Sequence, residues 1–310
     1  MEARQVQVLL EQADVQRRLS NYRGATELLR RALALDPDHA RAHAALALCL
    51  LGARRLPGAL IEMRAALQLD VDDPYVHYVA ASVLRAARKL DDAWAHCLIA
   101  LEDPSADPHY FVLAARICVL KSDREHAREL LGQALAKSAE HTAALTELAR
   151  LELAAGALDE AATQIERALV SDPADRDAHA VAGFIELARG DAAAAERHAR
   201  FVLNQNSTSQ SGLELWIAIK ARRSRLLGAW WRWNAFVSLR TDTKKLAVLI
   251  GSYVVARVLM IVTDELGYAG VSRVLQLAWL GFCAYTWYAP VVLRKWLKQE
   301  LGIVKLDPDF

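Results

Sequence analysis

The chain has few of the residues that build disulfide frameworks and zinc clusters. Cysteine occurs only four times in 310 residues, at Cys49, Cys97, Cys118 and Cys283, with no CxxC pair. A disulfide-stapled secreted domain or a zinc knuckle needs cysteines at short spacing, so both classes are disfavoured. The GxxxxGK[ST], GxSxG and HExxH motifs of common enzyme sites are also missing. We therefore expect no catalytic residues, no cofactor and no enzymatic activity.

The chain also lacks an excess of one charge and an apolar leader. Lysine and arginine total 38 against 37 aspartates and glutamates, a formal net charge of +1. This balance gives no global attraction to nucleic acid, and we expect no nucleic-acid partner. The first residues, Met-Glu-Ala-Arg, are followed by charged side chains within two turns of helix rather than by an apolar run. We therefore expect no secretory signal.

What the chain does contain is a repeat with a period of 34 residues. One series of alanines marks it at Ala25, Ala59, Ala93, Ala127, Ala161 and Ala195. A second series of small residues precedes each of these by a fixed offset, at Ala13, Ala47, Ala81, Ala115, Ala149 and Gly183. A third follows at Ala32, Ala66, Ala100, Ala134, Ala168 and Val202. Because small side chains let two helices approach closely, the three series predict paired helices.

In this register the chain resembles the tetratricopeptide repeat (TPR) family over residues 6–209. The resemblance implies an all-α fold, a right-handed solenoid of helix-turn-helix repeats in which each unit buries its apolar face on the next. The six predicted repeats are 6–39, 40–73, 74–107, 108–141, 142–175 and 176–209. They form a domain at 1–209, and a capping helix is predicted at 210–224.

One departure from the family concerns its tryptophan-like fourth position. Here that position holds Leu9, His43, His77, Phe111, Leu145 and His179. These histidines are dispersed over separate repeats, so we interpret them as packing residues. His126, His141 and His198 show no partner of ligand type at the i,i+4 spacing. The sequence therefore predicts no metal site.

The resemblance further implies that the first helix of each pair lines a concave groove that binds a protein or peptide. Its predicted groove residues are Tyr75, Tyr78, Arg85, His109, Arg116, Arg150 and Phe184. Arginine suits planar carboxylates, and tyrosine gives contact area at low entropic cost. We expect a peptide with acidic and apolar side chains; the alternative is an ordinary solvated face. The lysine and asparagine pattern with which some family members clamp a C-terminal carboxylate is absent.

The C-terminal third is different in kind. Residues 246–263 carry a single charge, Arg257, and residues 274–293 carry none. Since a spanning helix needs about 20 apolar residues, we predict a transmembrane helical hairpin at 246–293. Arg257 is an intramembrane charge that either reaches the interface or a polar neighbour, or faces a partner helix or a water-filled cavity.

Before the hairpin, residues 225–245 mix arginine and lysine with tryptophan and predict an interfacial helix. Its predicted membrane-interface residues are Trp230, Trp231, Trp233, Arg232, Lys244 and Lys245. Positive residues flank both outer ends of the hairpin, which predicts that the repeat domain and the tail, 294–310, face the cytosol. We expect a multi-pass membrane protein, in a bacterial inner membrane.

Three functions follow from these features. The leading hypothesis is a membrane-anchored scaffold whose solenoid binds a protein partner and recruits it to the lipid bilayer. A second is a sensor whose hairpin oligomerises into a pore or membrane-perturbing effector. A third is a structural subunit of a larger membrane complex, with homo- or hetero-oligomeric contacts through the hairpin.

Overall fold

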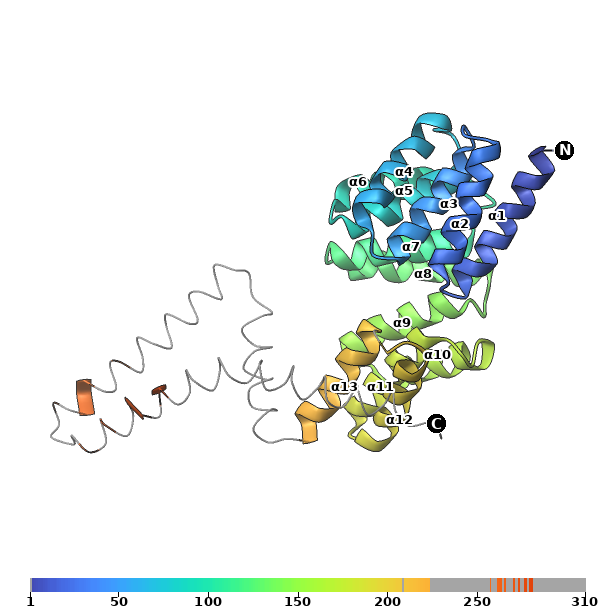
Figure 1. Cartoon of the computed structure of the whole chain (residues 1–310). Helices are drawn as coiled ribbons and strands as arrows, with labels where there is room; N and C mark the ends of the chain where they lie inside the picture. The colour runs from blue at the N-terminus through green and yellow to red at the C-terminus, as the bar shows by residue number, and fades with distance from the viewer. Residues whose placement is uncertain are drawn as a thin grey trace. The chain divides into compact units, whose positions relative to one another are not determined.

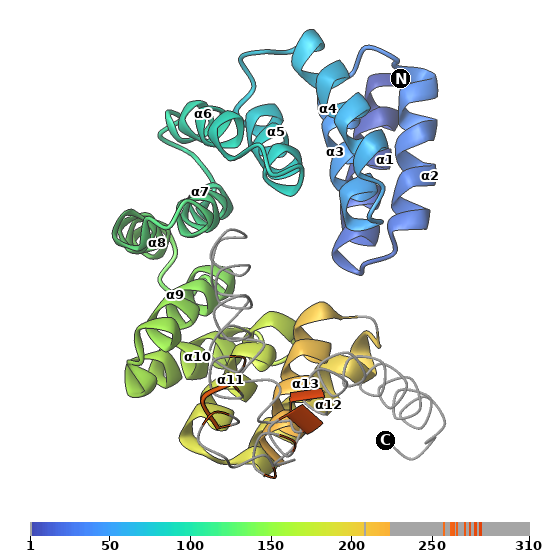
Figure 2. The same ribbon diagram turned by 90° about the vertical axis from the view of Figure 1, so that its left-hand side faces the viewer.

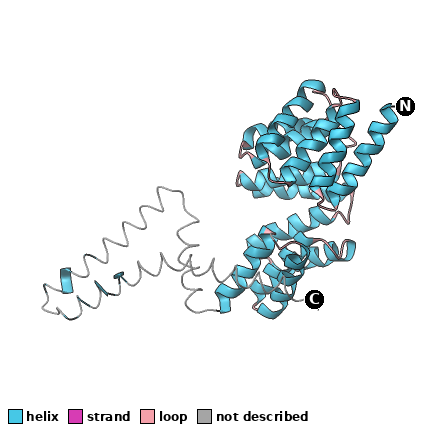
Figure 3. Ribbon diagram, in the orientation of Figure 1, coloured by secondary structure: helices cyan, strands magenta, loops and turns pink. Residues whose placement is uncertain are grey.

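The computed structural model describes residues 2–207 and 209–223, together with 257, 261–263, 265, 270, 273, 276–277 and 279–280. All regular structure in these residues is helical (Figure 3). The chain divides into two compact units, Met1–Val181 and Ala182–Phe310, which are described separately below. The predicted interfacial helix at 225–245, with its six interface residues, lies outside the described residues. So do the tail at 294–310 and most of the predicted hairpin.

Helices succeed one another with short turns between them (Figure 1). Their bounds are α1 Glu2–Arg18, α2 Tyr22–Leu35, α3 Ala40–Gly52, α4 Leu56–Leu69, α5 Pro74–Ala86, α6 Leu90–Leu101, α7 Pro108–Leu120, α8 Arg124–Lys137, α9 Thr142–Ala155, α10 Leu158–Ser171, α11 Arg176–Arg189, α12 Ala192–Gln205 and α13 Gln210–Arg223. In the first unit, consecutive helices pack as pairs from α1 with α2 to α9 with α10 (Figure 2). The first helices of successive pairs, α3, α5, α7 and α9, also pack on one another. The all-α helical solenoid predicted from the repeat is therefore confirmed.

The periodic alanines lie where the two helices of a pair meet. The alanines at positions 25, 59, 93, 127 and 161 are each fully buried. Four residues further along the second helix, a column of larger apolar side chains fills the space between pairs, at Leu29, Met63, Cys97, Leu131 and Ile165. Burying one such leucine contributes about 2 kcal/mol, so the stack of pairs supplies the core that no single pair could build.

In the second unit, α13 packs against α12. Leu215, Trp216 and Ile219 of α13 are buried with Ala199 and Leu203 of α12 in one apolar cluster. Gly183 belongs to the small-residue series, and the structure shows why: an added Cβ would lie 2.2 Å from a terminal methyl group of Leu215.

The histidines at the fourth position of helices α3, α5 and α11 hold the preceding turn. In each case Nε2 donates to the backbone carbonyl six residues earlier: His43 to Pro37 at 3.0 Å, His77 to Val71 at 2.6 Å and His179 to Pro173 at 3.0 Å. His77 is almost fully buried, and its Nδ1 lies 2.8 Å from Nδ1 of His96. Burial and the neighbouring His77 ring lower the pKa of His96, which favours its neutral form. His77 thus has the predicted packing role, while His43 and His179 are partly buried and make the same hydrogen bond.

The turn inside each pair repeats its backbone conformation with the same period. Ser20, Arg54, Arg88 and Ser122 have positive φ angles between 59° and 68°, and Gly156 and Gly190 follow at 85° and 101°. These six residues are 34 apart, so the repeat fixes a left-handed residue at the end of the first helix. Left-handed backbone disfavours residues with a Cβ by roughly 1–2 kcal/mol, which accounts for glycine at the last two positions.

Two exposed glycines give opposite predictions. An added Cβ meets no atom within 4 Å at either Gly132 or Gly156, but only Gly156 has a positive φ. Gly132 lies in the middle of α8, so Gly132→Ala is expected to stabilise the fold by about 0.5–1 kcal/mol. Gly156→Ala is expected to destabilise it by about 1 kcal/mol. Urea denaturation followed by circular dichroism measures both, and effects of the same sign would contradict the turn geometry.

Candidate functional site

Three tyrosines form a stacked row on the first helices. Tyr75 and Tyr78 of α5 have ring centroids 6.3 Å apart, and Tyr110 of α7 lies 4.6 Å from Tyr78 with its ring only 20° out of parallel. All three are half-buried. Tyr75 and Tyr78 are three residues apart, which places them on one face of the helix. Tyr110 escaped the sequence analysis because its neighbour in the row lies 32 residues earlier and comes close only when α5 and α7 stack.

The row is held as neutral phenols. Burial raises the pKa of Tyr110 to about 12 and also raises the pKa values of Tyr75 and Tyr78. Arg17 of α1 opposes this effect at Tyr75 and Tyr78, so a cation from the first repeat lies near tyrosines of the third. Burial disfavours the charge of Arg17, but Asp14, whose Oδ1 is 2.5 Å from the guanidinium, outweighs it and raises the pKa of Arg17. The three tyrosines therefore present aromatic rings that end in neutral hydroxyl groups.

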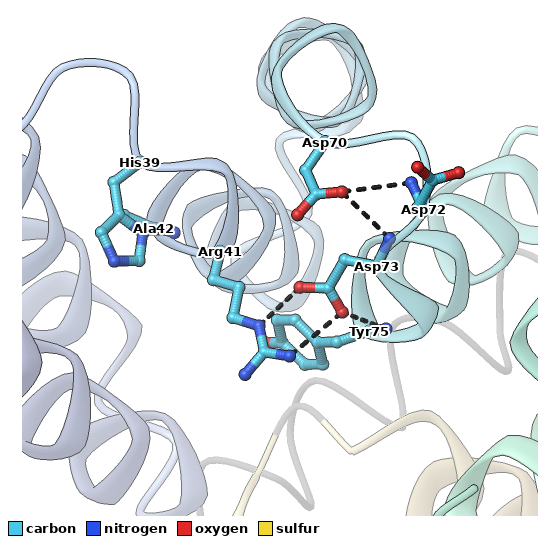
Figure 4. Close-up of polar contacts among 7 residues, drawn as sticks. All are labelled: His39, Arg41, Ala42, Asp70, Asp72, Asp73 and Tyr75. Carbon is cyan, nitrogen blue, oxygen red and sulfur yellow. Dashed lines mark hydrogen bonds and ion pairs between the residues drawn. The ribbon is translucent and has the colours of Figure 1, made fainter. Parts of the chain in front are cut away.

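The start of α5, and with it Tyr75, is fixed by an ion pair between repeats (Figure 4). Arg41 of α3 reaches the carboxylate of Asp73 with Nε at 2.5 Å and a terminal nitrogen at 3.2 Å. Asp73 is buried and caps α5, since its Oδ1 accepts the backbone N–H of Tyr75 at 2.9 Å. Asp70 in turn accepts the backbone N–H groups of Asp72 and Asp73, each at 3.1 Å. The first turn of α5 is therefore fixed by Arg41 from the preceding repeat and by Asp70 from the turn before the helix.

Arg116 and Arg150 meet on a shared carboxylate. Arg116 of α7 donates to Oε1 of Glu147 on α9, from Nε at 2.9 Å and from a terminal nitrogen at 2.8 Å. Nε of Arg150 lies 3.5 Å from the other oxygen of Glu147. Burial disfavours the charge of Arg116, but Glu147 and then Asp177 raise its pKa. The two arginines predicted to meet a partner's carboxylate thus already share an internal one. Sequence reasoning missed it for Arg116 because Glu147 lies in the next repeat, and for Arg150 although Glu147 lies only three residues earlier in the same helix.

Arg85 of α5 is in a different state. Its Nε is buried without a hydrogen-bond partner, and within the described part of the chain it makes no ion pair. Burial and then the like charge of Arg116 lower its pKa. The hydroxyl of Thr146, 1% exposed on α9, is also buried without a partner. Arg85 interacts electrostatically with both Tyr78 and Glu147, so it belongs to the same surface as the tyrosine row. We call Tyr75, Tyr78, Tyr110, Arg85, Arg116, Glu147 and Arg150 the tyrosine–arginine surface.

Two predicted groove residues lie elsewhere. His109 is exposed and contacts Asp107 and His141 rather than the tyrosines. Donor atoms of these three side chains lie within 4.8 Å of one another, so they could hold a metal ion. Phe184 belongs to the second unit, where it packs on the apolar cluster of α12 and α13. Of the residues predicted to lie in or beside a membrane, Arg257 is within the described part of the chain, where it is an exposed helical residue. Among the described residues, no helix combines the length and the apolar character that crossing a bilayer requires.

Comparison with known proteins supports the repeat assignment. The tetratricopeptide repeat model matches residues 17–83 and 121–183. No curated protein gives a significant match.

Solved structures resemble the fold at low sequence identity. PilW, described as a widely conserved type IV pilus biogenesis factor, is 20% identical, with a TM-score of 0.53 over 68% of this chain and 98% of that one. TTC0263, a thermophilic TPR protein of Thermus thermophilus, is 23% identical, with a TM-score of 0.53 over 58% of this chain and 98% of that one. PilF of Pseudomonas aeruginosa is 18% identical, with a TM-score of 0.50 over 69% and 98%. The chain therefore contains tetratricopeptide repeats that fold into a TPR-type helical solenoid.

Proposed function

We propose that this chain is a scaffold that binds a polypeptide on the tyrosine–arginine surface. An aspartate or glutamate of the partner pairs with Arg85, and an aromatic or aliphatic side chain next to it packs on Tyr78 and Tyr110. The observation that carries this proposal is the half-buried guanidinium of Arg85, whose Nε has no partner. Tetratricopeptide repeats generally bind protein or peptide partners, which is consistent with this use of the surface.

Binding of a carboxylate would compensate for the cost of burying the guanidinium of Arg85 in the free protein. A buried charged group without a partner destabilises the free protein, whereas a charge-assisted hydrogen bond to it is among the stronger polar contacts. Burial and then Arg116 lower the pKa of Arg85, and Glu147 opposes them only in part, so an incoming carboxylate adds a favourable interaction. The adjacent tyrosines add contact area with few rotatable bonds.

The neighbouring arginines have a different role in this proposal. Glu147 pairs closely with Arg116 and more loosely with Arg150, so one negative charge offsets part of the two positive charges before any partner arrives. In this proposal Arg116 and Arg150 hold α7 and α9 in register through Glu147, and Arg85 is the cation that selects an acidic side chain. The proposed ligand is still a peptide with acidic and apolar side chains, as expected from the sequence. Its acidic side chain contacts Arg85 rather than Arg116 or Arg150.

Substitution of Arg85 tests this assignment. Binding of fluorescein-labelled peptides that contain Asp or Glu next to Tyr, Phe or Leu is measured by fluorescence anisotropy. Arg85→Glu is expected to weaken the tightest peptide by about 2 kcal/mol or more, roughly 30-fold in Kd. Arg85→Lys is expected to fall between this variant and the parent, because it keeps the charge but loses the planar fork.

The matched control is Arg30→Glu, which makes the same charge change at an exposed position on α2. This control is expected to bind like the parent chain. Equal losses in Arg85→Glu and Arg30→Glu would reduce the effect to net charge and contradict a specific contact.

The scaffold is further proposed to be anchored in a membrane by its C-terminal segments. Residues 274–293 form an uncharged apolar run of the length that spans a bilayer, and 246–263 form a second run with one charge, Arg257. Lysine and arginine flank both outer ends of the pair, which favours a cytosolic repeat domain and a cytosolic tail, in a bacterial inner membrane. The tryptophans and arginines of 225–245 suit the headgroup region, where they would meet anionic lipid.

Extraction of membranes tests the anchor. After expression in bacteria and a wash of the membrane fraction with sodium carbonate at alkaline pH, the full chain is expected in the pellet. A chain ending at residue 224 is expected in the supernatant, because it lacks both apolar runs. Release of the full chain by carbonate would contradict a spanning hairpin while leaving the peptide-binding proposal untouched.

A further inference from the structure

We propose that Asp107, His109 and His141 form a binding site for a divalent transition-metal ion of the zinc class. The site lies at the N-terminal ends of α7 and α9, next to the tyrosine–arginine surface, since Asp107 interacts electrostatically with Tyr110 and Tyr78. It does not depend on the peptide-binding function proposed above.

The donor atoms already have the separation that such an ion needs. Nδ1 of His109 is 2.8 Å from Oδ1 of Asp107 and 3.1 Å from Nε2 of His141. All three donors lie within 4.8 Å of one another. Zinc–ligand distances of 2.0–2.2 Å in a tetrahedron place neighbouring donors about 3.3 Å apart. Two of the three separations are near this value and the third is at most 4.8 Å, so rotation of the exposed Asp107 and His109 side chains can bring the donors into this geometry.

The second observation is that protons cannot satisfy this cluster. Nδ1 of His141 accepts the backbone N–H of Ala144 at 3.2 Å, so the proton of the neutral ring lies on Nε2 and points at Nδ1 of His109. If Nδ1 of His109 is unprotonated and accepts that hydrogen bond, it has no hydrogen to donate to the carboxylate of Asp107, and two acceptors face each other. If it donates to Asp107 instead, two N–H groups of the histidines face each other. In each arrangement one contact joins two donors or two acceptors.

A metal ion removes this conflict, because it takes lone pairs from all three atoms. Coordination by Nε2 of His141 moves the ring proton to Nδ1, where it would face the backbone N–H of Ala144, so the ring gives up this cap and must turn away from that group. That N–H group keeps a partner, since it also donates to the backbone carbonyl of His141 at 3.0 Å. Metal binding therefore costs the backbone N–H group of Ala144 one of its two acceptors, Nδ1 of His141, and leaves the other, the carbonyl oxygen of His141.

The site follows from the repeat. Asp107 and His141 are 34 residues apart and are the N-cap residues of α7 and α9. Stacking of these two helices brings the two caps together, and His109 stands between them in the first turn of α7. Each ligand is thereby attached to a helix end, which limits its movement. The absence of a partner one helical turn away, on which the sequence-based rejection of His141 rested, does not test for ligands one repeat away.

The ligand set indicates which ion binds. Two imidazole nitrogens and one carboxylate oxygen suit zinc, nickel or copper, whereas magnesium and calcium prefer oxygen alone. The side chains of Asp107 and His109 are more than half exposed, which leaves room for water or an added ligand at a fourth position. Three protein ligands with an open position are also the pattern of catalytic zinc sites.

Titration of the tag-free, metal-stripped full chain with zinc chloride in detergent at pH 7.5 tests the proposal by isothermal titration calorimetry. The parent is expected to bind one zinc ion at this site, and replacement by cobalt(II) is expected to give the visible absorption of a low-coordinate cobalt complex. His109→Ala is expected to weaken binding by about tenfold or more, because His109 has no capping role. His141→Ser is expected to do the same while keeping a side chain that can cap α9.

The control is His126→Ala, which removes a half-exposed histidine of α8 outside the cluster and is expected to bind like the parent. Should His141→Ser fail to fold, His109→Ala still decides the question, because its side chain is exposed. The proposal is overturned if the parent does not bind zinc, or if His109→Ala binds as tightly as His126→Ala.

Discussion

The structure depends on one constraint: each helix pair can bury its apolar face only against the next pair. The small residues at three points of the 34-residue period let the two helices of a pair approach closely. Fully buried alanines such as Ala93 and Ala127 show this contact, with Cys97 and Leu131 filling the space between pairs. Because the spacing is constant, equivalent positions in neighbouring repeats come to lie side by side, and the polar chemistry of the surface is decided there.

Cross-repeat neighbours determine which side chains are satisfied and which remain available. Glu147 satisfies Arg116 from the next repeat, while Arg85, one repeat earlier, has no such carboxylate. At the helix ends, Asp73 receives Arg41, whereas the equivalent Asp107 and His141 meet His109 in a cluster that protons do not satisfy. The same rule thus gives one site suited to an acidic side chain and another suited to a metal ion. Within the residues that the structure describes, a polar side chain at each site lacks the cross-repeat partner that a side chain of the same type has in a neighbouring repeat.

The periodic residues predicted the helix pairs, the buried alanine column and the packing role of His77, because burial depends on local spacing that the sequence displays. Pairings such as Tyr78 with Tyr110 or Arg116 with Glu147 could not be predicted in the same way. They join side chains about one repeat apart, and which of several nearby positions touch depends on how far each pair is rotated on the next. Searching for ligands at one-repeat spacing, rather than at one helical turn, is the signal that would have connected His109 with His141.

The placement of charges across repeats is tested most directly by a double-mutant cycle on Arg116 and Glu147. The free energy of unfolding is measured by urea denaturation for the parent, Arg116→Ala, Glu147→Ala and the double variant. If the two side chains pair across α7 and α9, the coupling energy should be about 0.5 kcal/mol or more, and it should fall at high salt. Additive effects, with no coupling, would contradict the register that gives Arg116 a direct ion pair with Glu147.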